Sequence, residues 1–313
     1  MQILITGGAG FIGSHLVERL LLDGHKVVCY DNFDPFYDAG IKRTNLRSIM
    51  QHPDFVLIEA SILDVANLND CFDYYDIDLV IHLAAKAGVR PSIADPKSYY
   101  ETNVNGTLNI LEAMKNHSVK KMIFASSSSV YGNNTKVPFS ESDFVDHPVS
   151  PYAASKKAVE LMCHTYHHLY EFDIFCMRFF TVYGPRQRPD LAIHKFAELI
   201  LNDQPLPVYG DGSSSRDYTY IEDIIDGLMK AIDNLKGYNI FNLGESRTIT
   251  LLQMVESVKK HIGKKIKINS LPMQPGDVLT TFADISKAKE ILGYNPSWSF
   301  DEGIKKFIEW KRS

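Results

Sequence analysis

The stretch Thr6-Gly7-Gly8-Ala9-Gly10-Phe11-Ile12-Gly13 ends a short apolar segment, over which we predict a strand at residues 2–6. Its spaced glycines permit a tight turn, close approach of a pyrophosphate, and close packing of a helix on the strand. A helix that begins inside the stretch presents its N-terminal amides and positive dipole end to the phosphates. Strand, glycine loop and helix in this order predict a dinucleotide site contacted by Gly7, Gly10, Phe11 and Ile12.

The next strand, predicted over residues 26–30, ends at an acid, Asp31. A carboxylate there accepts hydrogen bonds from the ribose hydroxyls and repels a 2′-phosphate, which favours NAD over NADP. Asn32 follows it and is included in the predicted cofactor site. Beyond a third strand, Asp64 and Val65 are expected beside the adenine; the alternative is that Asp64 caps the following helix.

Apolar segments alternate with helical patterns over the first half of the chain. Strands are predicted at residues 2–6, 26–30, 55–59, 77–83, 119–125 and 174–179. This alternation is typical of an α/β fold, a Rossmann-type doubly wound parallel sheet with helices on both faces. Leu83, Ala84 and Ala85 end the fourth strand at the carboxyl edge, where the cofactor lies. His82 within that strand is interpreted as a hydrogen-bonded core histidine rather than a catalyst.

The regular alternation stops after Arg178, where short segments rich in proline, glycine and aromatic residues replace it. We therefore predict an NAD-binding domain over residues 1–180 and a smaller α/β substrate-binding lobe over 181–313. Residues 222–245, with a helix and a strand, are predicted to return to the first domain.

A second pattern, Tyr152-Ala153-Ala154-Ser155-Lys156, places two reactive side chains four residues apart. On a helix such residues share a face. A phenol has a pKa near 10, but a nearby ammonium favours the phenolate, so Lys156 can make Tyr152 a useful base. Ser127 supplies a hydroxyl that can share the substrate proton. We predict Ser127, Tyr152 and Lys156 as catalytic residues.

Composition excludes several classes of protein. The 313 residues carry a net charge of −5 with a pI near 6.1, and the basic residues are dispersed, which gives no sign of nucleic-acid or membrane binding. Four separated cysteines in apolar surroundings are typical of reduced thiols in a cytoplasmic protein. We expect no signal peptide, no transmembrane segment and no metal site.

Together these motifs resemble the extended short-chain dehydrogenase/reductases, in particular the nucleotide-sugar epimerases and dehydratases, over essentially the whole chain. The resemblance implies an isomerase that uses NAD and a UDP-sugar. It also implies a homodimer through a four-helix bundle built from the helices around 97–117 and 152–171.

Ser128 and Ser129 distinguish the reactions within this family. A 4,6-dehydratase would carry Asp and Glu there to eliminate water, and a UDP-glucuronate decarboxylase would usually carry Glu at position 129. The segments most similar to UDP-glucuronate 4-epimerases are residues 31–38 with Lys42-Arg43, residues 86–90, and residues 178–189. Lys86 and Pro91 depart from the usual Gln and frequent Tyr of those enzymes. A UDP-galactose epimerase would normally carry Asn at the position of Thr181.

A sugar carboxylate suits the same residues physically. Arg188 offers a charged fork, and Thr181, Ser128 and Ser129 offer hydroxyl donors that a C6 hydroxymethyl would not need. The alternative is that Arg186 and Arg188 bind the diphosphate or are solvated. The resemblance adds Lys86 to the cofactor site. It also gives further substrate contacts at Arg90, Tyr209, Arg216 and Asp277.

We therefore expect NAD-dependent 4-epimerisation of UDP-glucuronate to UDP-galacturonate through a transient 4-keto sugar. The alternatives are a UDP-glucose/UDP-galactose 4-epimerase, a UDP-glucuronate decarboxylase, and a protein that binds NAD as a sensor without catalysis. An intact Ser127, Tyr152 and Lys156 argues against the last, because a sensor does not need an activated phenol.

Overall fold

The computed structural model describes residues 1–272 and 280–313 and divides the chain into two compact units. The first unit comprises Met1–Asn133, Asp143–Arg178 and Leu228–Phe241, and the second comprises Asn134–Ser142, Phe179–Gly227 and Asn242–Ser313. The chain therefore crosses between the units more than once. The sequence had not indicated that residues 134–142 belong to the second unit.

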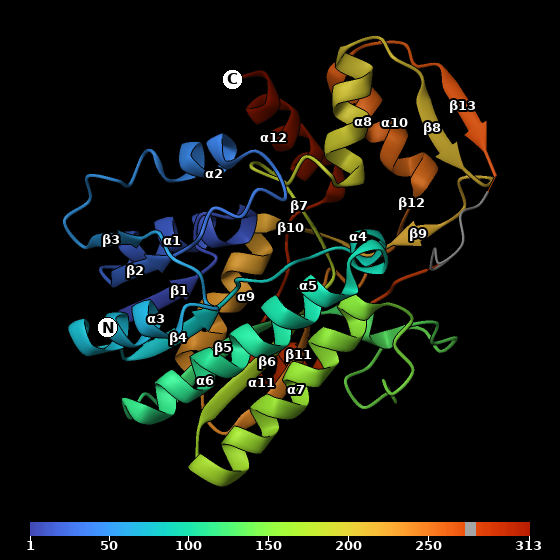
Figure 1. Cartoon of the computed structure of the whole chain (residues 1–313). Helices are drawn as coiled ribbons and strands as arrows, with labels where there is room; N and C mark the ends of the chain where they lie inside the picture. The colour runs from blue at the N-terminus through green and yellow to red at the C-terminus, as the bar shows by residue number, and fades with distance from the viewer. Residues whose placement is uncertain (273–279) are drawn as a thin grey trace. The chain divides into compact units, whose positions relative to one another are not determined.

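A seven-stranded sheet forms the centre of the first unit (Figure 1). Its spatial order is β3 (Phe55–Ile58), β2 (Lys26–Tyr30), β1 (Gln2–Thr6), β4 (Leu79–His82), β5 (Lys121–Ser127), β6 (Asp173–Phe179) and β11 (Tyr238–Leu243). The pairings from β3 through β5 are parallel. All six predicted strands are present, with ends displaced by two residues at most. The predicted doubly wound α/β fold is confirmed.

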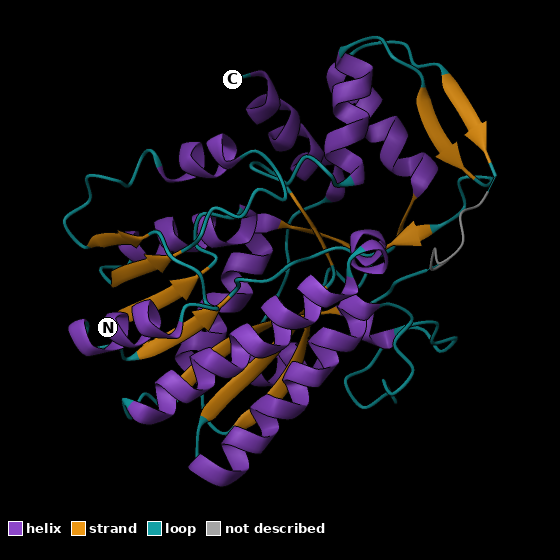
Figure 2. Cartoon of the chain, viewed as in Figure 1, coloured by secondary structure: helices purple, strands orange, loops and turns teal. Residues whose placement is uncertain are grey.

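Three helices cover one face of this sheet: α3 (Val65–Tyr74), α6 (Gly106–Asn116) and α7 (Pro151–Tyr170), which lie in front of the strands in Figure 2. Their apolar stripes join the strands in one buried cluster that includes Leu68, Ile110 and Val159. A stripe of this kind recurs every three to four residues and is what positions a helix on a sheet. Helix α1 (Phe11–Leu22) lies behind the strands in the same view.

Shorter helices complete the first unit. They are α2 (Ala39–Leu46), α4 (Val89–Ala94), α5 (Pro96–Tyr100), the π-helix η1 (Glu101–Asn105) and the 3₁₀-helix η2 (Ser128–Tyr131). The long helix predicted around 97–117 thus consists of α5, η1 and α6 in succession. A π-helical turn inside an α-helix is rare and often marks a functional site.

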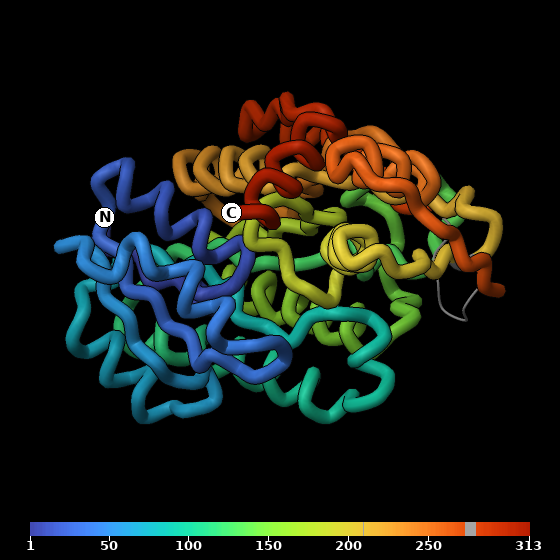
Figure 3. The backbone as a smooth tube through the Cα atoms, turned by 90° about the horizontal axis from the view of Figure 1, so that it is seen from above, coloured from blue at the N-terminus to red at the C-terminus, as the bar shows by residue number. Residues whose placement is uncertain are grey.

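Among its described residues, the second unit contains three two-stranded sheets. They pair β7 (Thr181–Tyr183) with β10 (Tyr218–Tyr220), β9 (Ser215–Arg216) with β12 (Ile249–Thr250), and β8 (Leu206–Tyr209) with β13 (Ile268–Leu271). Its helices are α8 (Ala192–Leu201), α9 (Ile221–Asn234, which continues into the first unit), α10 (Leu251–Ile262), α11 (Ser286–Leu292) and α12 (Phe300–Arg312). Helix α10 packs against α8 and α12, as the orange, yellow and red tubes of Figure 3 show. Capping boxes begin α10 at Thr250 and α12 at Ser299.

Candidate active site

In the glycine loop between β1 and α1, neither Gly7 nor Gly13 has room for a side chain. Gly7 has a φ of +73°, and a Cβ there would lie 2.7 Å from the backbone nitrogen of Ala84. A Cβ on Gly13 would lie 2.3 Å from the carbonyl oxygen of Gly7. The loop is therefore packed against the carboxyl end of β4, and its amides and the N-terminus of α1 form a cradle that fits a pyrophosphate.

Asp31, at the end of β2, is buried beside this loop. Its Oδ2 accepts a hydrogen bond from the Ala9 amide at 3.0 Å, and its Oδ1 accepts one from the Phe33 amide at 2.8 Å. A carboxylate oxygen can accept two hydrogen bonds, so the group keeps acceptor capacity for ribose hydroxyls. The cradle and this acid together fit NAD. Asn32, beside it, is exposed and accepts from the amide of Asp34.

Asp64 has the role that the sequence offered as its alternative. It is the N-cap of α3, and its two carboxylate oxygens accept from the amide and the side-chain nitrogen of Asn67. These hydrogen bonds lower the pKa of Asp64. Val65, the first residue of α3, is half exposed. A contact of either residue with adenine stays a prediction.

His82 is a core histidine, as the sequence indicated. Its Nδ1 lies 2.6 Å from Thr6 Oγ1 and its Nε2 lies 2.9 Å from Thr107 Oγ1. Because the Thr107 hydroxyl donates to the Asn103 carbonyl at 2.6 Å, His82 donates through Nε2 and accepts through Nδ1. Burial, together with the charge of Lys156, lowers the pKa of His82 to about 3, so the ring is neutral.

The π-helix η1 positions a residue that the predicted site did not include. Asn103 is buried, its Oδ1 accepts from the Lys86 amide at 2.8 Å, and its Nδ2 donates to the Lys86 carbonyl at 3.0 Å. The same Nδ2 donates to Ser155 Oγ on α7 at 2.9 Å. Asn103 therefore holds the segment after Leu83, Ala84 and Ala85 against the helix that carries Tyr152. A buried amide inside an apolar helical pattern was the sequence signal for it.

Ser127, Tyr152 and Lys156 all lie in the first unit, on β5 and α7. Helix α7 begins at Pro151, and Ser150 caps it by accepting from the Ala153 amide at 3.1 Å, so Tyr152 lies in the first turn. The Tyr152 ring meets Tyr99 edge to face with centroids 6.3 Å apart. Ser127 Oγ donates to Ser129 Oγ at 3.1 Å.

Lys156 is buried one turn after Tyr152. Its Nζ donates to the Ala125 carbonyl on β5 at 2.7 Å and lies 4.8 Å from the centre of the Phe124 ring. Burial lowers the pKa of Lys156 to about 7, against the opposing influence of Cys163, Glu160 and Cys176. Its charge is thus available at neutral pH but readily lost, which suits a group that assists proton transfer.

The remaining predicted substrate residues of the first unit lie close in sequence to these elements. Ser128 and Ser129 form the start of η2, directly after Ser127. Arg90 is exposed on α4.

The second unit carries the other predicted substrate residues. Thr181 begins β7, and its amide donates to the Asp217 carbonyl at 3.0 Å. Arg216, on β9, donates through Nη1 to the Ser215 carbonyl at 2.9 Å. Tyr209 ends β8, and Asp277 lies outside the described residues.

Arg188 already has a carboxylate partner within the chain. Its Nε and Nη2 donate to the two oxygens of Asp190 at 2.9 Å and 2.7 Å. Although burial raises the pKa of Asp190, the Arg188 guanidinium outweighs it and holds that pKa below its ordinary value. The fork of Arg188 is therefore held in one orientation by a bidentate ion pair that the sequence reading did not anticipate.

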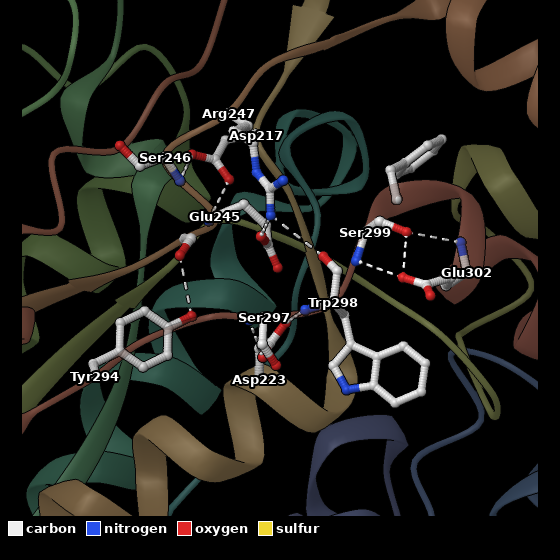
Figure 4. Close-up of polar contacts among 12 residues, drawn as sticks. Asp217, Asp223, Glu245, Ser246, Arg247, Tyr294, Ser297, Trp298, Ser299 and Glu302 are labelled. Carbon is white, nitrogen blue, oxygen red and sulfur yellow. Dashed lines mark hydrogen bonds and ion pairs between the residues drawn. The ribbon is translucent and has the colours of Figure 1, made fainter.

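Three buried acids of the second unit, Asp217, Asp223 and Glu245, make polar contacts with neighbouring residues, as Figure 4 shows. Asp217 accepts from the amides of Glu245, Ser246 and Ala283 at 2.7, 3.0 and 3.1 Å. Burial nevertheless raises the pKa of Asp217 to about 6. Nearby, Asp223 accepts from the amides of Ser297 and Trp298. These acids hold loops together, and the predicted site had missed them.

Within residues 1–272 and 280–313, His, Cys, Asp and Glu side chains form no group of three that could hold a metal ion. Over the same part of the chain, none of the helices is long and apolar enough to span a membrane.

Comparison with known proteins agrees with this arrangement. UDP-glucuronate 4-epimerase of Thermodesulfobacterium geofontis is 44% identical over 310 residues, which cover 99% of this chain and 95% of that one. The crystal structure of UDP-glucuronic acid 4-epimerase from Bacillus cereus, in complex with UDP-glucuronic acid and NAD, matches with a TM-score of 0.94 and 39% identity, covering 100% of this chain and 99% of that one. UDP-glucose 4-epimerase from Thermotoga maritima, with UDP-glucose, matches with a TM-score of 0.92 and 34% identity, covering 100% and 99%.

The family model described as GDP-mannose 4,6 dehydratase matches residues 4–307, nearly the full length. With the glycine cradle, Asp31 and the Tyr152–Lys156 helix described above, the chain belongs to this family of extended short-chain dehydrogenase/reductases.

Proposed function

We propose that this protein is an NAD-dependent nucleotide-sugar 4-epimerase and that its substrate is UDP-glucuronate. The observation that carries the proposal is the arrangement of β5, η2 and α7. Lys156, a buried ammonium, lies one helical turn after Tyr152 and donates to the Ala125 carbonyl of the strand that ends at Ser127. Ser128 and Ser129, rather than acids, follow Ser127. Relatives named as UDP-glucuronate 4-epimerases support the same reaction.

In this mechanism Tyr152 removes the O4 proton of the sugar, assisted by the Lys156 ammonium, while Ser127 shares that proton through its hydroxyl. Bound NAD⁺ supplies the hydride acceptor for C4 and later the hydride donor. The 4-keto sugar turns about its diphosphate and presents its other face, and Tyr152 then returns the proton. The cofactor is held by Gly7, Gly10, Phe11 and Ile12 at the phosphates and by Asp31 and Asn32 at the ribose. The remaining residues of the proposed cofactor site are Asp64, Val65, Leu83, Ala84, Ala85, Lys86, Tyr152 and Lys156.

Arg188, Thr181, Ser128 and Ser129 bind the sugar carboxylate in this proposal. Because Arg188 pairs with Asp190 in the described structure, Asp190 acts as a carboxylate that keeps the fork oriented until the substrate shares or displaces it. Loss of CO₂ removes the carboxylate charge in the transition state. Donors that bind this charge stabilise the ground state more, so they also suppress decarboxylation.

The rest of the substrate is assigned by resemblance to the family. Arg216 binds the diphosphate as a bidentate cation, Tyr209 and Asp277 contact the uridine, and Arg90 is a further substrate contact. UDP-glucose is the second candidate substrate, because a UDP-glucose 4-epimerase has a similar fold over its full length.

We also propose a homodimer through α5–η1–α6 and α7. Four apolar side chains on these helices, Tyr100, Leu108, Leu161 and Leu169, are 41% to 59% exposed. Exposed apolar residues grouped on packed helices mark an interaction surface. A cytoplasmic location stays a prediction that rests on four buried cysteine thiols.

One experiment separates the candidate functions. The protein is incubated separately with UDP-glucuronate and UDP-glucose, and the nucleotide sugars are resolved by chromatography. We expect UDP-galacturonate from the first substrate and much slower formation of UDP-galactose from the second. Faster conversion of UDP-glucose, or a UDP-pentose as the main product, would replace the proposed substrate or reaction, and no conversion of either would leave NAD binding alone.

A further inference from the structure

Glu160 lies on the same face of α7 as the proposed catalytic residues. It follows Lys156 by four residues and Tyr152 by eight, which is one and two helical turns. Its side chain is only 1% exposed. A buried carboxylate two turns behind a reactive tyrosine plays no part in the mechanism above.

The carboxylate of Glu160 joins three elements of the first unit. Its Oε1 accepts from Arg178 Nε on β6 at 2.8 Å and from Ser126 Oγ on β5 at 2.6 Å, and its Oε2 accepts from Arg178 Nη2 at 2.8 Å. Lys157 Nζ lies 3.6 Å from the same Oε2. The backbone carbonyl of Glu160 accepts from the Tyr238 hydroxyl on β11 at 3.0 Å.

Stability alone is a weak reason for this ion pair. Arg178 is also 1% exposed, and its guanidinium lies 4.8 Å from the centre of the Tyr131 ring. Removing two charges from water costs several kcal/mol per ion, and apolar residues of similar volume often stabilise a core equally well. The orientation that a bidentate pair imposes is the property that apolar residues cannot supply.

Three consecutive residues of β5 connect Glu160 to the site. The Ala125 carbonyl accepts from Lys156, the Ser126 hydroxyl donates to Glu160, and Ser127 is the proposed catalytic serine. Fixing Ser126 therefore fixes the backbone on both sides of it. A displacement of the reacting groups by about 1 Å can cost a hundredfold in rate.

Glu160 also contributes charge. The titratable groups whose charges influence Lys156 or are influenced by it include Glu160 and Cys163 on α7, Cys176 on β6 and His82 on β4. His82 is neutral, because its pKa is lowered to about 3, and burial raises the pKa of Cys176 well above its ordinary value. Glu160 is thus a carboxylate that opposes the effect of burial on Lys156.

We propose that Glu160 is a positioning residue for the reaction, oriented by Arg178: it holds Ser126 so that Ser127 is placed correctly, and it keeps Lys156 charged. This inference rests on the proposed function for the roles of Ser127 and Lys156. Its claim about Lys156 concerns the protein alone and can be tested without substrate.

The first test follows Lys156 by carbon-13 NMR of lysine labelled at Cε, with the resonance assigned by its loss in Lys156→Met. In Glu160→Gln, which keeps an oxygen acceptor and removes the charge, the midpoint of the Lys156 titration should move about one pH unit lower. Arg178→Lys keeps the charge at β6 but breaks the bidentate pair with Glu160, so it should lower the melting temperature. The midpoint of the Lys156 titration should stay within a few tenths of a pH unit of the wild-type value. An unmoved midpoint in folded Glu160→Gln overturns the electrostatic part of the proposal.

The second test uses Ser126→Ala, which removes one hydroxyl and no charge, so that a result is obtained even if Glu160→Gln fails to fold. With whichever UDP-sugar the wild type epimerises, we expect kcat to fall about tenfold or more with KM nearly unchanged. In Glu160→Gln the whole pH profile of kcat/KM should also move to lower pH. Wild-type kcat in Ser126→Ala would overturn the positioning part. If the wild type converts no UDP-sugar, the proposed function fails while the NMR titration still decides the role of Glu160.

Discussion

One buried acid from each unit shows a different way of holding a carboxylate. In the first, Glu160 meets a guanidinium from a neighbouring strand in a bidentate pair. In the second, Asp217 is held by three backbone amides, and its pKa rises to about 6 because burial outweighs them. A neighbouring cation stabilises a buried carboxylate through its charge, whereas backbone amides stabilise it through hydrogen bonds alone. In the first unit, the ion pair fixes the orientation of the carboxylate that also accepts from Ser126. In the second unit, Asp217 joins two segments that are distant in the sequence, around Glu245 and Ala283.

Tyr152→Phe should have the largest effect, because it removes the proton acceptor and very little volume. We expect a loss of at least about a thousandfold in kcat for UDP-glucuronate and UDP-glucose alike, with NAD still bound. Steady-state rates and an NAD-binding titration measure this. Near wild-type rates would remove Tyr152 from the mechanism, and a loss restricted to one substrate would mean that Tyr152 is not the proton acceptor for both.

Arg188→Ala is the matching change in the second unit and should discriminate between substrates. We expect a barrier higher by about 2–5 kcal/mol for UDP-glucuronate, the range for truncating one partner of a buried charge pair, and little change for UDP-glucose. A UDP-pentose by-product is also expected, because the 4-keto acid is then free to turn its carboxylate into line with the carbonyl and lose CO₂.

Asp190→Asn is the control for Arg188, since it keeps the shape and removes the competing charge. It should leave KM for UDP-glucuronate unchanged or lower it. If Arg188→Ala weakens both substrates equally, Arg188 serves the diphosphate and the choice of glucuronate loses its main physical support.

Asp31 should make the protein bind NAD⁺ more tightly than NADP⁺, by about tenfold to a hundredfold, because a 2′-phosphate would be placed against a buried carboxylate. Titration of protein freed of nucleotide with each cofactor tests this. In Asp31→Asn the affinities for NAD⁺ and NADP⁺ should lie closer together. Equal affinities in the wild type would mean that Asp31 serves only the Ala9 and Phe33 amides.

Glu245→Gln should change stability rather than rate. Burial, together with Asp223, raises the pKa of Glu245 from 4.5 to about 8, although Arg247 opposes this. Between these values the folded state keeps a proton that the unfolded state has released, so this group makes the protein less stable as the pH rises from 4.5 to 8. The free energy of unfolding, measured with denaturant, should rise in Glu245→Gln relative to the wild type by about 1 kcal/mol or more between pH 4.5 and pH 8. If the two unfolding free energies differ by the same amount at pH 5 and pH 8, the raised pKa of Glu245 is contradicted.

The parts of the site that the sequence predicted are those set by local geometry. Gly7 and Gly13 are required because a Cβ would collide with nearby backbone, and the spacing of Tyr152 and Lys156 puts them on one helical face wherever the helix lies. Asp190 was missed although it is only two residues from Arg188, because a short Arg-x-Asp pattern is too common to indicate a pair.

The sequence by itself determined the doubly wound sheet, the glycine cradle and the helix that carries Tyr152 and Lys156, since strand and helix periodicity and glycine sterics act over a few residues. Only the tertiary structure decided which distant groups meet. Asn103 binds the backbone of Lys86, 17 residues away in the sequence, and Glu160 pairs with Arg178, 18 residues away. Asp217 accepts from the amide of Ala283, 66 residues away. A buried polar group must find its partners wherever the fold brings them, and no local pattern specifies that meeting.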